Sequence, residues 1–405
     1  MEDIYQNKIP KLNPEINIYH RDDEYIITFR GNNCHLKVNS NIYALLLLVD
    51  NNRSLSEIVF EYNSTIDNPI DNELAHDLFF NKLGYYNIIE NDGAKHDPYR
   101  SPSYLKLNYI FINEYYTQLI TRPFLFLFRG RLILPLIFFC LFVFISCLFK
   151  NHNEIINYVN EIPPVHFITY IVLLIISSIF HEMGHAAATY YYGGAHSGIG
   201  FGFYLLTPVL YSDVSSAWKF DSKKRIVVNL AGIYFELVFG TTLILIALLT
   251  SYTPILIIPI IILFKTLFNL NPFFRTDGYW ILSDFFKVPN LKSTSDKYLS
   301  NFLSNRLKEK RSRIENFLIV YALISYAFIF VFLFTVIILN PVSVITFPRD
   351  ITFYVMDILN DQAKLSVDRI SKLIIPFMFY FLLIRLARTN IKKYYGLKQK
   401  KSSEK

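Results

Sequence analysis

The sequence predicts a mainly α-helical membrane protein: a polytopic bundle of about six transmembrane helices, preceded by a small winged-helix-like α+β domain. Three observations carry this prediction. The 405 residues are 52% hydrophobic but only 18% charged, which is less charge than soluble domains of this size carry. Apolar stretches long enough to cross a bilayer recur through the second and third thirds of the chain. The N-terminal part, in contrast, mixes polar residues with short strand and helix patterns.

The predicted N-terminal domain covers residues 1–98. Ser54-Leu55-Ser56-Glu57 is a capping box that opens a helix. Asp71 begins a further helix that Gly84 ends, and Leu74 and Leu78, then Phe79 and Leu83, are expected on its inner face at i,i+4 spacing. Strands are expected at 25–29, 35–38 and 86–89, and helices at 41–49, 55–62 and 71–83. The chain begins without an apolar leader segment, so we expect this domain in the cytoplasm.

The order of these elements and the Ser-Leu-Ser-Glu-Ile helix start resemble PqqD-like domains, which are peptide-recognition elements in modified-peptide biosynthesis. The resemblance implies that residues 1–98 bind a peptide substrate, whose leader would add a strand to the edge of the domain's sheet. The alternative is a generic small domain that docks on the membrane part.

The remainder of the chain is expected to be membrane-bound. Residues 99–128 are predicted to be a linker with an interfacial segment, because Phe124–Phe128 alternates Phe and Leu between two arginines. Spans are expected at 132–149, 166–191, 226–249, 253–270, 315–339 and 370–388. Basic residues alternate between the two sides of these spans, so both termini are expected in the cytoplasm and 341–368 is expected to be an outward-facing loop.

The net charge of +7 lies mostly beside these apolar spans. This distribution favours the lipid bilayer as a partner, and no nucleic acid partner is expected because no basic and aromatic residues interleave in a recognition motif. The three cysteines form no disulfide or metal framework.

The second predicted span carries His181-Glu182-Met183-Gly184-His185. Histidines four residues apart lie on one face of a helix, one turn above the other, and can bind one zinc ion. Glu182 would lie beside that ion as a base for a water molecule. Ionisable residues are costly in an apolar span and therefore indicate a functional site. The alternative is a chance match to a short motif on a packed helix.

A catalytic zinc needs a third protein ligand and an open position for water. His166 precedes His181 by about 22 Å of helix, too far to share an ion. His196 follows a Gly-Gly break and has no known ligand spacing, and Asp213 is a fallback. Asp277 is the better candidate, because it follows the fourth span at the same expected end of the bundle as His185, and Gly278 permits a tight turn there.

Two further ionisable residues lie in the expected spans. Glu236 lies about one turn into the third span and could orient a ligand histidine through its second ring nitrogen, or pair with a neighbouring helix. Lys265 shares a helix face with Asn269, and its long side chain is expected to extend to the membrane interface.

The motif H-E-M-G-H, followed by an apolar span ending N-x-x-P-x-x-x-x-D-G, resembles the site-2 protease family of intramembrane zinc metalloproteases. The resemblance covers residues 165–282; it suggests a protease core at 129–282 and leaves 283–405 as a C-terminal loop with two further spans. It implies that residues 193–216 form a membrane-associated hairpin or re-entrant loop that meets the substrate, the alternative being a plain interfacial connector. It also implies metal ligands His181, His185 and Asp277, catalytic base Glu182, substrate-binding Asn269 and turn residue Gly278.

Phe274, Thr276 and Tyr279 depart from the common form of the second motif. The form N-P-F-F-R-T-D-G-Y-W, joined to a PqqD-like domain, resembles the peptide zinc metalloprotease branch found in bacterial peptide-maturation clusters. It implies a multi-pass zinc metalloendopeptidase of the bacterial inner membrane that hydrolyses a precursor peptide, with transporters or modifying enzymes as partners. The alternatives are a regulatory intramembrane protease that releases a membrane-bound regulator, and a non-catalytic peptide-binding immunity or export component.

Overall fold

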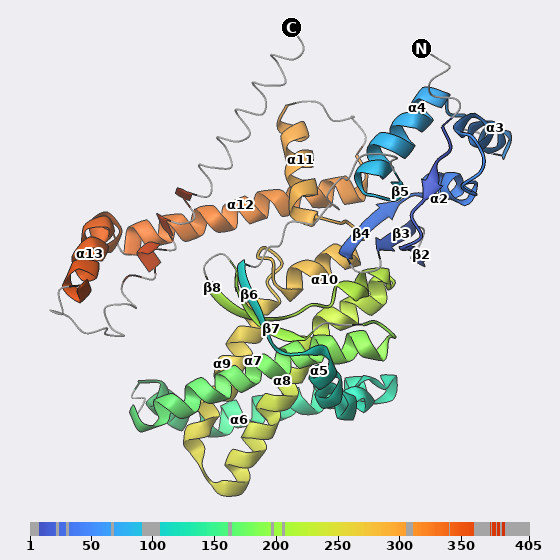
Figure 1. The fold of residues 1–405 in the computed structure, drawn as a ribbon. Helices are drawn as coiled ribbons and strands as arrows, with labels where there is room; N and C mark the ends of the chain where they lie inside the picture. Colours follow the sequence, from blue (N-terminus) through green and yellow to red (C-terminus); the bar gives the residue numbers. More distant parts are fainter. Residues whose placement is uncertain are drawn as a thin grey trace. The chain divides into compact units, whose positions relative to one another are not determined.

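A computed structural model describes residues 8–21, 24–29, 32–65, 69–90, 106–160, 164–195, 198–204, 207–304, 311–339 and 341–359, with isolated positions up to 384. Helices make up most of the described chain (Figure 1). The chain divides into two compact units, Met1–Pro289 and Asn290–Lys405. All the predicted site residues belong to the first unit.

The N-terminal domain combines a three-stranded antiparallel sheet, in the order β2-β3-β4, with helices that share one apolar core with it. The core joins Ile27 and Val38 of the sheet to Leu55, Ile58 and Phe79 of the helices. Its elements are β1 (Lys11–Leu12), β2 (Ile16–Arg21), β3 (Glu24–Phe29), β4 (Asn32–Val38), α2 (Ser40–Leu47), α3 (Leu55–Thr65), α4 (Asn72–His76), the π-helical η1 (Asp77–Leu83) and β5 (Ile89–Glu90). β1 pairs with β5 and ties the two ends of the domain together.

The predicted helix starts in this domain are confirmed. The Ser54 backbone N–H donates to the Glu57 carboxylate at 2.8 Å, as a capping box requires. The Leu74 backbone N–H donates to Asp71 at 2.7 Å. The expected inner face was wrong at one position, because Leu74 is 52% exposed. The buried face runs through Ala75, Phe79 and Leu83 at i,i+4 spacing, which turns Leu74 outward.

A second sheet lies among the apolar helices that follow the N-terminal domain. β6 (Lys106–Ile112), β7 (Ile199–Tyr204) and β8 (Thr207–Ser212) are antiparallel in the order β6-β7-β8. Residues 193–216, for which the sequence left a hairpin and a re-entrant loop as alternatives, therefore contain the antiparallel strands of a hairpin. The third strand of the sheet, β6, comes from the predicted linker, where no strand was expected. Gly200 lets the Tyr211 ring lie against the sheet, because a Cβ there would come within 2.7 Å of that ring.

The predicted interfacial segment is partly packed into the protein. α5 (Glu114–Thr121) leads into η2 (Arg122–Phe128), a 3-10 helix. Leu127 and Phe128 are buried, and the Phe128 ring stacks on that of Phe235 at 5.7 Å between centroids. Only Phe126 of this segment is largely exposed among the described large hydrophobic residues. The segment therefore anchors the strand β6 to the helices.

Among the described residues, four helical stretches are long and apolar enough to cross a membrane: Gly130–Ile156, Ile168–Tyr191, Ser222–Thr250 and Arg313–Leu339. They lie in α6 (Gly130–Asn160), α7 (Pro164–Tyr191), α8 (Ser222–Thr250) and α12 (Arg313–Leu339). These confirm four of the six expected spans as long apolar helices. The expected span 253–270 is a shorter apolar helix, Thr253–Asn269, comprising η4 (Thr253–Leu256) and α9 (Ile257–Asn269). Most of 370–388 lies outside the described residues.

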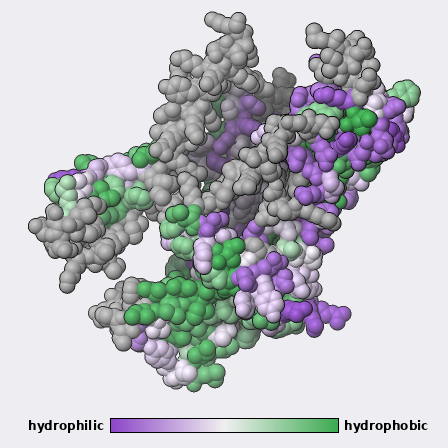
Figure 2. All heavy atoms as spheres, viewed as in Figure 1, coloured by the Kyte–Doolittle hydropathy of each residue, from purple (hydrophilic) through white to green (hydrophobic). Residues whose placement is uncertain are grey.

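The outward faces of these helices are strongly apolar. Figure 2 shows hydrophobic surface gathered over the helices in the lower part of the view. The side chains of Phe138, Phe142 and Ile168 are 68%, 67% and 74% exposed, and those of Leu249 and Phe264 are 86% and 68% exposed. Soluble monomers rarely expose so much contiguous apolar surface, so these faces are compatible with contact with lipid.

The second unit contains α11 (Leu291–Leu303), α12 and α13 (Pro341–Leu359). The expectation of a loop at 341–368 was wrong over its described part, which is helical. Pro341 occupies the first helical position, where its missing N–H costs nothing. Pro348 lies within the helix, and Thr352 donates a side-chain hydrogen bond to its carbonyl at 2.7 Å. Local contacts thus sustain a helix in the segment between two expected spans.

Candidate metal centre

α7 presents His181 and His185 on one face, one turn apart. Their Nε2 atoms lie 3.0 Å apart, and the residues are 6% and 7% exposed. α10 (Asp277–Phe285) begins with Asp277, whose carboxylate oxygens lie 3.1 Å from His181 Nε2 and 3.5 Å from His185 Nε2. The structure therefore brings together the three residues that the sequence analysis selected as ligands.

The geometry of this group fits a divalent metal. Zinc bound tetrahedrally at about 2.0–2.1 Å from each ligand separates neighbouring ligand atoms by about 3.3 Å. The two Nε2 atoms lie 3.0 Å apart, and Asp277 brings Oδ2 to 3.1 Å from His181 and Oδ1 to 3.5 Å from His185. Asp277 Oδ2 is buried and has no hydrogen-bond partner in the described chain, as expected of an oxygen that can bind a cation. Within the described residues, this is the one cluster of three or more such side chains able to share an ion.

The backbone of α8 forms one wall of the centre at Gly232. A Cβ atom at this position would lie 2.5 Å from His185 Nε2 and 2.6 Å from His181 Nε2. Gly184 of α7 packs against the same stretch, since its Cβ would lie 2.2 Å from the Ala231 carbonyl oxygen. Two glycines therefore allow α7 and α8 to approach closely enough for the imidazoles to meet beside the α8 backbone.

The second nitrogen of each imidazole faces α8. His185 Nδ1 lies 2.7 Å from the Val228 carbonyl oxygen, a distance at which Nδ1–H donates. His181 Nδ1 lies 3.2 Å from Glu236 Oε2, although the pair is misaligned for an ideal hydrogen bond. Contacts of this kind fix ring orientation and leave Nε2 to the metal. Glu236 thus lies beside a candidate ligand histidine, as one of its two predicted alternatives requires.

Glu236 is fully buried and has a second set of partners. Its Oε1 accepts from Ser177 Oγ at 3.1 Å and forms an ion pair with Lys265 Nζ. Lys265 also donates to Ser178 Oγ at 2.8 Å. The expectation that Lys265 extends to the interface was wrong, because a buried carboxylate requires a neighbouring cation and α9 supplies it. The network joins α7, α8 and α9 behind His181.

Glu182 follows the first ligand histidine and is half-buried. The backbone of Ser212, the last residue of β8, forms a hydrogen bond with its carboxylate. Asn269 is the half-buried last residue of α9. Gly278 is the second residue of α10, and its role differs from the predicted turn. A Cβ there would lie 2.2 Å from the Leu270 carbonyl oxygen, so this glycine permits close packing of α10 on the end of α9.

The other candidates lie elsewhere or outside the described residues. His166 accepts or donates a hydrogen bond with the Tyr252 hydroxyl at 3.2 Å, near the start of α7. Asp213 accepts the Ser215 backbone N–H at 3.0 Å and so shapes the start of η3 (Ser215–Lys219). Neither belongs to the metal group. His196 lies outside the described residues.

Sequence reasoning did not find Gly232, the Val228 carbonyl or the Ser212 backbone. A signal for the first was present, because Gly232 and Glu236 are four residues apart and therefore share a face of α8. The backbone contacts of Val228 and Ser212 depend on tertiary packing and leave no mark in residue identity.

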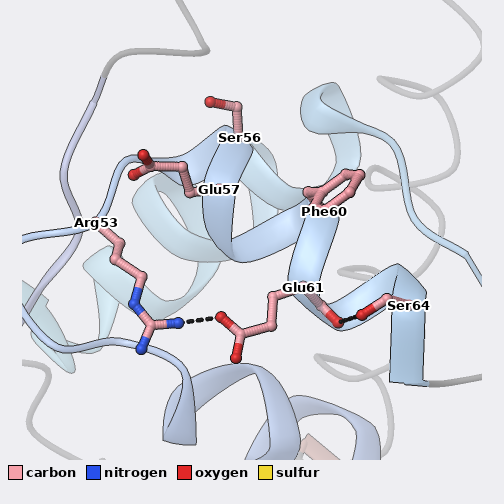
Figure 3. Close-up of a pocket in the computed structure, with 6 residues that line it drawn as sticks. All are labelled: Arg53, Ser56, Glu57, Phe60, Glu61 and Ser64. Carbon is pink, nitrogen blue, oxygen red and sulfur yellow. Dashed lines mark hydrogen bonds and ion pairs between the residues drawn. The ribbon is translucent and has the colours of Figure 1, made fainter.

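A separate pocket lies on α3 of the N-terminal domain (Figure 3). It is lined by Arg53, Ser56, Glu57, Phe60, Glu61 and Ser64. Arg53 forms an ion pair with Glu61, and Phe60 is 79% exposed. The pocket contains none of the metal-group residues, so it is not part of the metal centre.

Comparison with known proteins found a distant relative. A protein of Bacillus subtilis (strain 168) named "Putative peptide zinc metalloprotease protein YydH" is 26% identical over 163 residues, which are 38% of this chain and 64% of that relative. No family model matches the chain. No solved structure matches it. The chain thus spans less than two thirds of the length of this relative.

Proposed function

We propose that this protein is a membrane-embedded zinc metalloendopeptidase that hydrolyses a peptide bond in a precursor peptide. The observation that carries the proposal is the convergence of His181, His185 and Asp277 within 3.5 Å of one another, with Glu182 adjacent. The four apolar helices and the similarity to a peptide zinc metalloprotease support it.

Each residue has a distinct part in the proposed mechanism. His181, His185 and Asp277 would hold zinc, which when bound supplies Lewis acidity to the substrate carbonyl and to the attacking water. Glu182 accepts the proton of that water and delivers it to the leaving nitrogen. The hydrogen bond from the Ser212 backbone holds the Glu182 carboxylate in place for both transfers. Val228 and Glu236 keep the two imidazoles oriented.

The substrate is proposed to bind as an extended strand along β8. β8 is an edge of the sheet β6-β7-β8, and its last residue contacts Glu182. A peptide added to that edge would carry its backbone past the catalytic carboxylate. Asn269, at the end of α9, is proposed to hold the substrate near the scissile bond.

The biological setting follows from the same proposal. Residues 1–98 are proposed to be a PqqD-like domain that recognises the leader of a precursor peptide. The protein would lie in a bacterial cell membrane with both termini in the cytoplasm, and modifying enzymes or a transporter would be its partners.

The variant Glu182→Gln tests the proposal. It should bind zinc as the wild type does, because the ligands are unchanged, and cleave a precursor peptide encoded near its gene at least about 100-fold more slowly. Elemental analysis of purified protein and mass spectrometry of the peptide measure the two quantities. His181→Ala is the matched control and should lose zinc. Cleavage at the wild-type rate by Glu182→Gln would refute the mechanism, and zinc binding without turnover of any peptide by the wild type would favour a non-catalytic role.

A further inference from the structure

A buried ion pair joins α8 to α10 two helical turns beyond the metal ligand Asp277. Arg225 Nε donates to Asp284 Oδ1 at 2.9 Å, and Nη2 contacts the same oxygen. Both residues are 7% exposed. We infer that this ion pair is a positioning device that holds Asp277 in register with the two histidines. The inference rests on the proposed metal site.

Helical geometry places the two carboxylates of α10 on one face. Asp284 follows Asp277 by seven residues, which is close to two full turns and about 10.5 Å of rise. α10 is short, spanning only Asp277–Phe285, so a contact at one end fixes the rotation and height of the other. Rotation of α10 by one residue would move the Asp277 carboxylate away from both Nε2 atoms.

The partner groups on α8 also share one face. Arg225, Asn229, Gly232 and Glu236 follow at spacings of four, three and four residues, which is the spacing of a single helical stripe. Asn229 Nδ2 donates to Asp284 Oδ2 at 3.3 Å, so both Asp284 oxygens have partners. One stripe therefore binds Asp284 at one end and supports the histidines at the other.

Neighbouring contacts hold the ion pair itself. Arg225 Nη1 donates to the Phe220 carbonyl oxygen at 3.0 Å, and the guanidinium lies 5.6 Å from the Trp218 ring centroid. Trp218 meets Trp280 of α10 edge to face at 6.2 Å. A guanidinium fork has a fixed geometry that an apolar contact lacks. Because buried ion pairs add little net stability, a role in specifying the position of α10 explains this one better than stability alone.

The variant Asp284→Asn, in the full chain purified in detergent, tests the inference. It removes the charge without changing side-chain size, and the zinc dissociation constant, measured by competition with a chromogenic chelator, should rise at least about tenfold. Ser283→Ala is the matched control: Ser283 is buried in the same helix and donates to the Val288 carbonyl oxygen at 2.7 Å. Its zinc affinity should equal that of the wild type. Circular dichroism of the metal-free proteins reports whether each is folded.

A double-mutant cycle shows whether the ion pair acts through Asp277. In the Asp277→Ala background, Asp284→Asn should cause no further loss of zinc affinity. An equal loss in both backgrounds, or no loss in the wild-type background, would overturn the inference while leaving the metal site intact. A wild-type protein that binds no zinc would overturn the proposed function and the inference together. If Asp284→Asn does not fold, Arg225→Lys keeps the charge but loses the fork, and wild-type zinc affinity in that variant would be the overturning result.

Discussion

At the candidate metal centre, the two ring nitrogens of each histidine face different groups: one faces α8 and the other faces the cluster of candidate ligands. His185 directs Nδ1 to the Val228 carbonyl and Nε2 to the ligand cluster. His181 likewise places Nδ1 near a group of α8, 3.2 Å from Glu236 Oε2. A proton on Nδ1 of each ring would leave Nε2 available to bind a metal. The ligand set therefore depends on the backbone of α8 as much as on its side chains.

Gly232→Ala is predicted to abolish tight zinc binding while leaving the protein folded. The added methyl group would lie within 2.6 Å of both Nε2 atoms, in the space between the ligands. Alanine is otherwise favoured over glycine in a helix by up to about 1 kcal/mol, so α8 should remain helical. Elemental analysis and circular dichroism of the purified variant would measure the two effects.

The control for this variant is Gly240→Ala in the same helix. Its added Cβ would meet the outer end of the Phe144 ring and no metal ligand. Its zinc content per folded molecule should match that of the wild type. Full zinc occupancy in Gly232→Ala would show that α8 does not border the metal as described.

Helix α8 organises the centre at the level of secondary-structure elements. Its stripe of Arg225, Asn229, Gly232 and Glu236 contacts residues of α7, α9 and α10. The three candidate ligands themselves come from α7 and α10. α8 thus supplies no ligand but sets the relative position of the elements that do.

Glu236→Gln is predicted to weaken zinc binding by about 10–100-fold, because the carboxylate beside His181 Nδ1 becomes a neutral amide. It should also lower thermal stability, since the Lys265 side chain, which is 31% exposed, would lose its buried counter-charge. Adding Lys265→Met separates the two effects. The double variant should regain stability but not zinc affinity, as measured by thermal unfolding and chelator competition. Recovery of zinc affinity in the double variant would mean that Glu236 acts only by balancing Lys265.

The sequence was sufficient to select the candidate ligands that the structure brings together, but not their surroundings. His181, Glu182 and His185 follow from helical spacing alone, and Asp277 from a motif at the end of an apolar helix. β6 and the Ser212 contact were not predicted, because each depends on pairing between segments far apart in the chain. The expectation for Lys265 was wrong because long basic side chains usually extend to the membrane interface, whereas Lys265 pairs with the buried carboxylate of Glu236. The helix pattern does not reveal that partner.

At the scale of the whole molecule, the segment that connects the N-terminal domain to the long apolar helices forms a strand, β6, of the second sheet. The buried core of the domain draws on residues between Leu12 and Ile89, so it is complete without the membrane part. β6 begins at Lys106, beyond the predicted domain boundary at 98, and pairs with β7. Removal of residues 1–98 therefore leaves the sheet next to Glu182 with all its strands.

Deletion of residues 1–98 is predicted to separate substrate recognition from catalysis. If the domain binds the leader, the truncated protein should cleave a full precursor with a kcat/KM at least about tenfold lower, mainly through a higher KM. A short peptide that contains the cleavage site but no leader should be cleaved equally by both proteins, because it never used the domain. Zinc content should be unchanged, which confirms that the truncated core is folded. Equal kcat/KM for the full precursor in both proteins would show that residues 1–98 do not recognise the leader, since every other contact of the substrate is preserved.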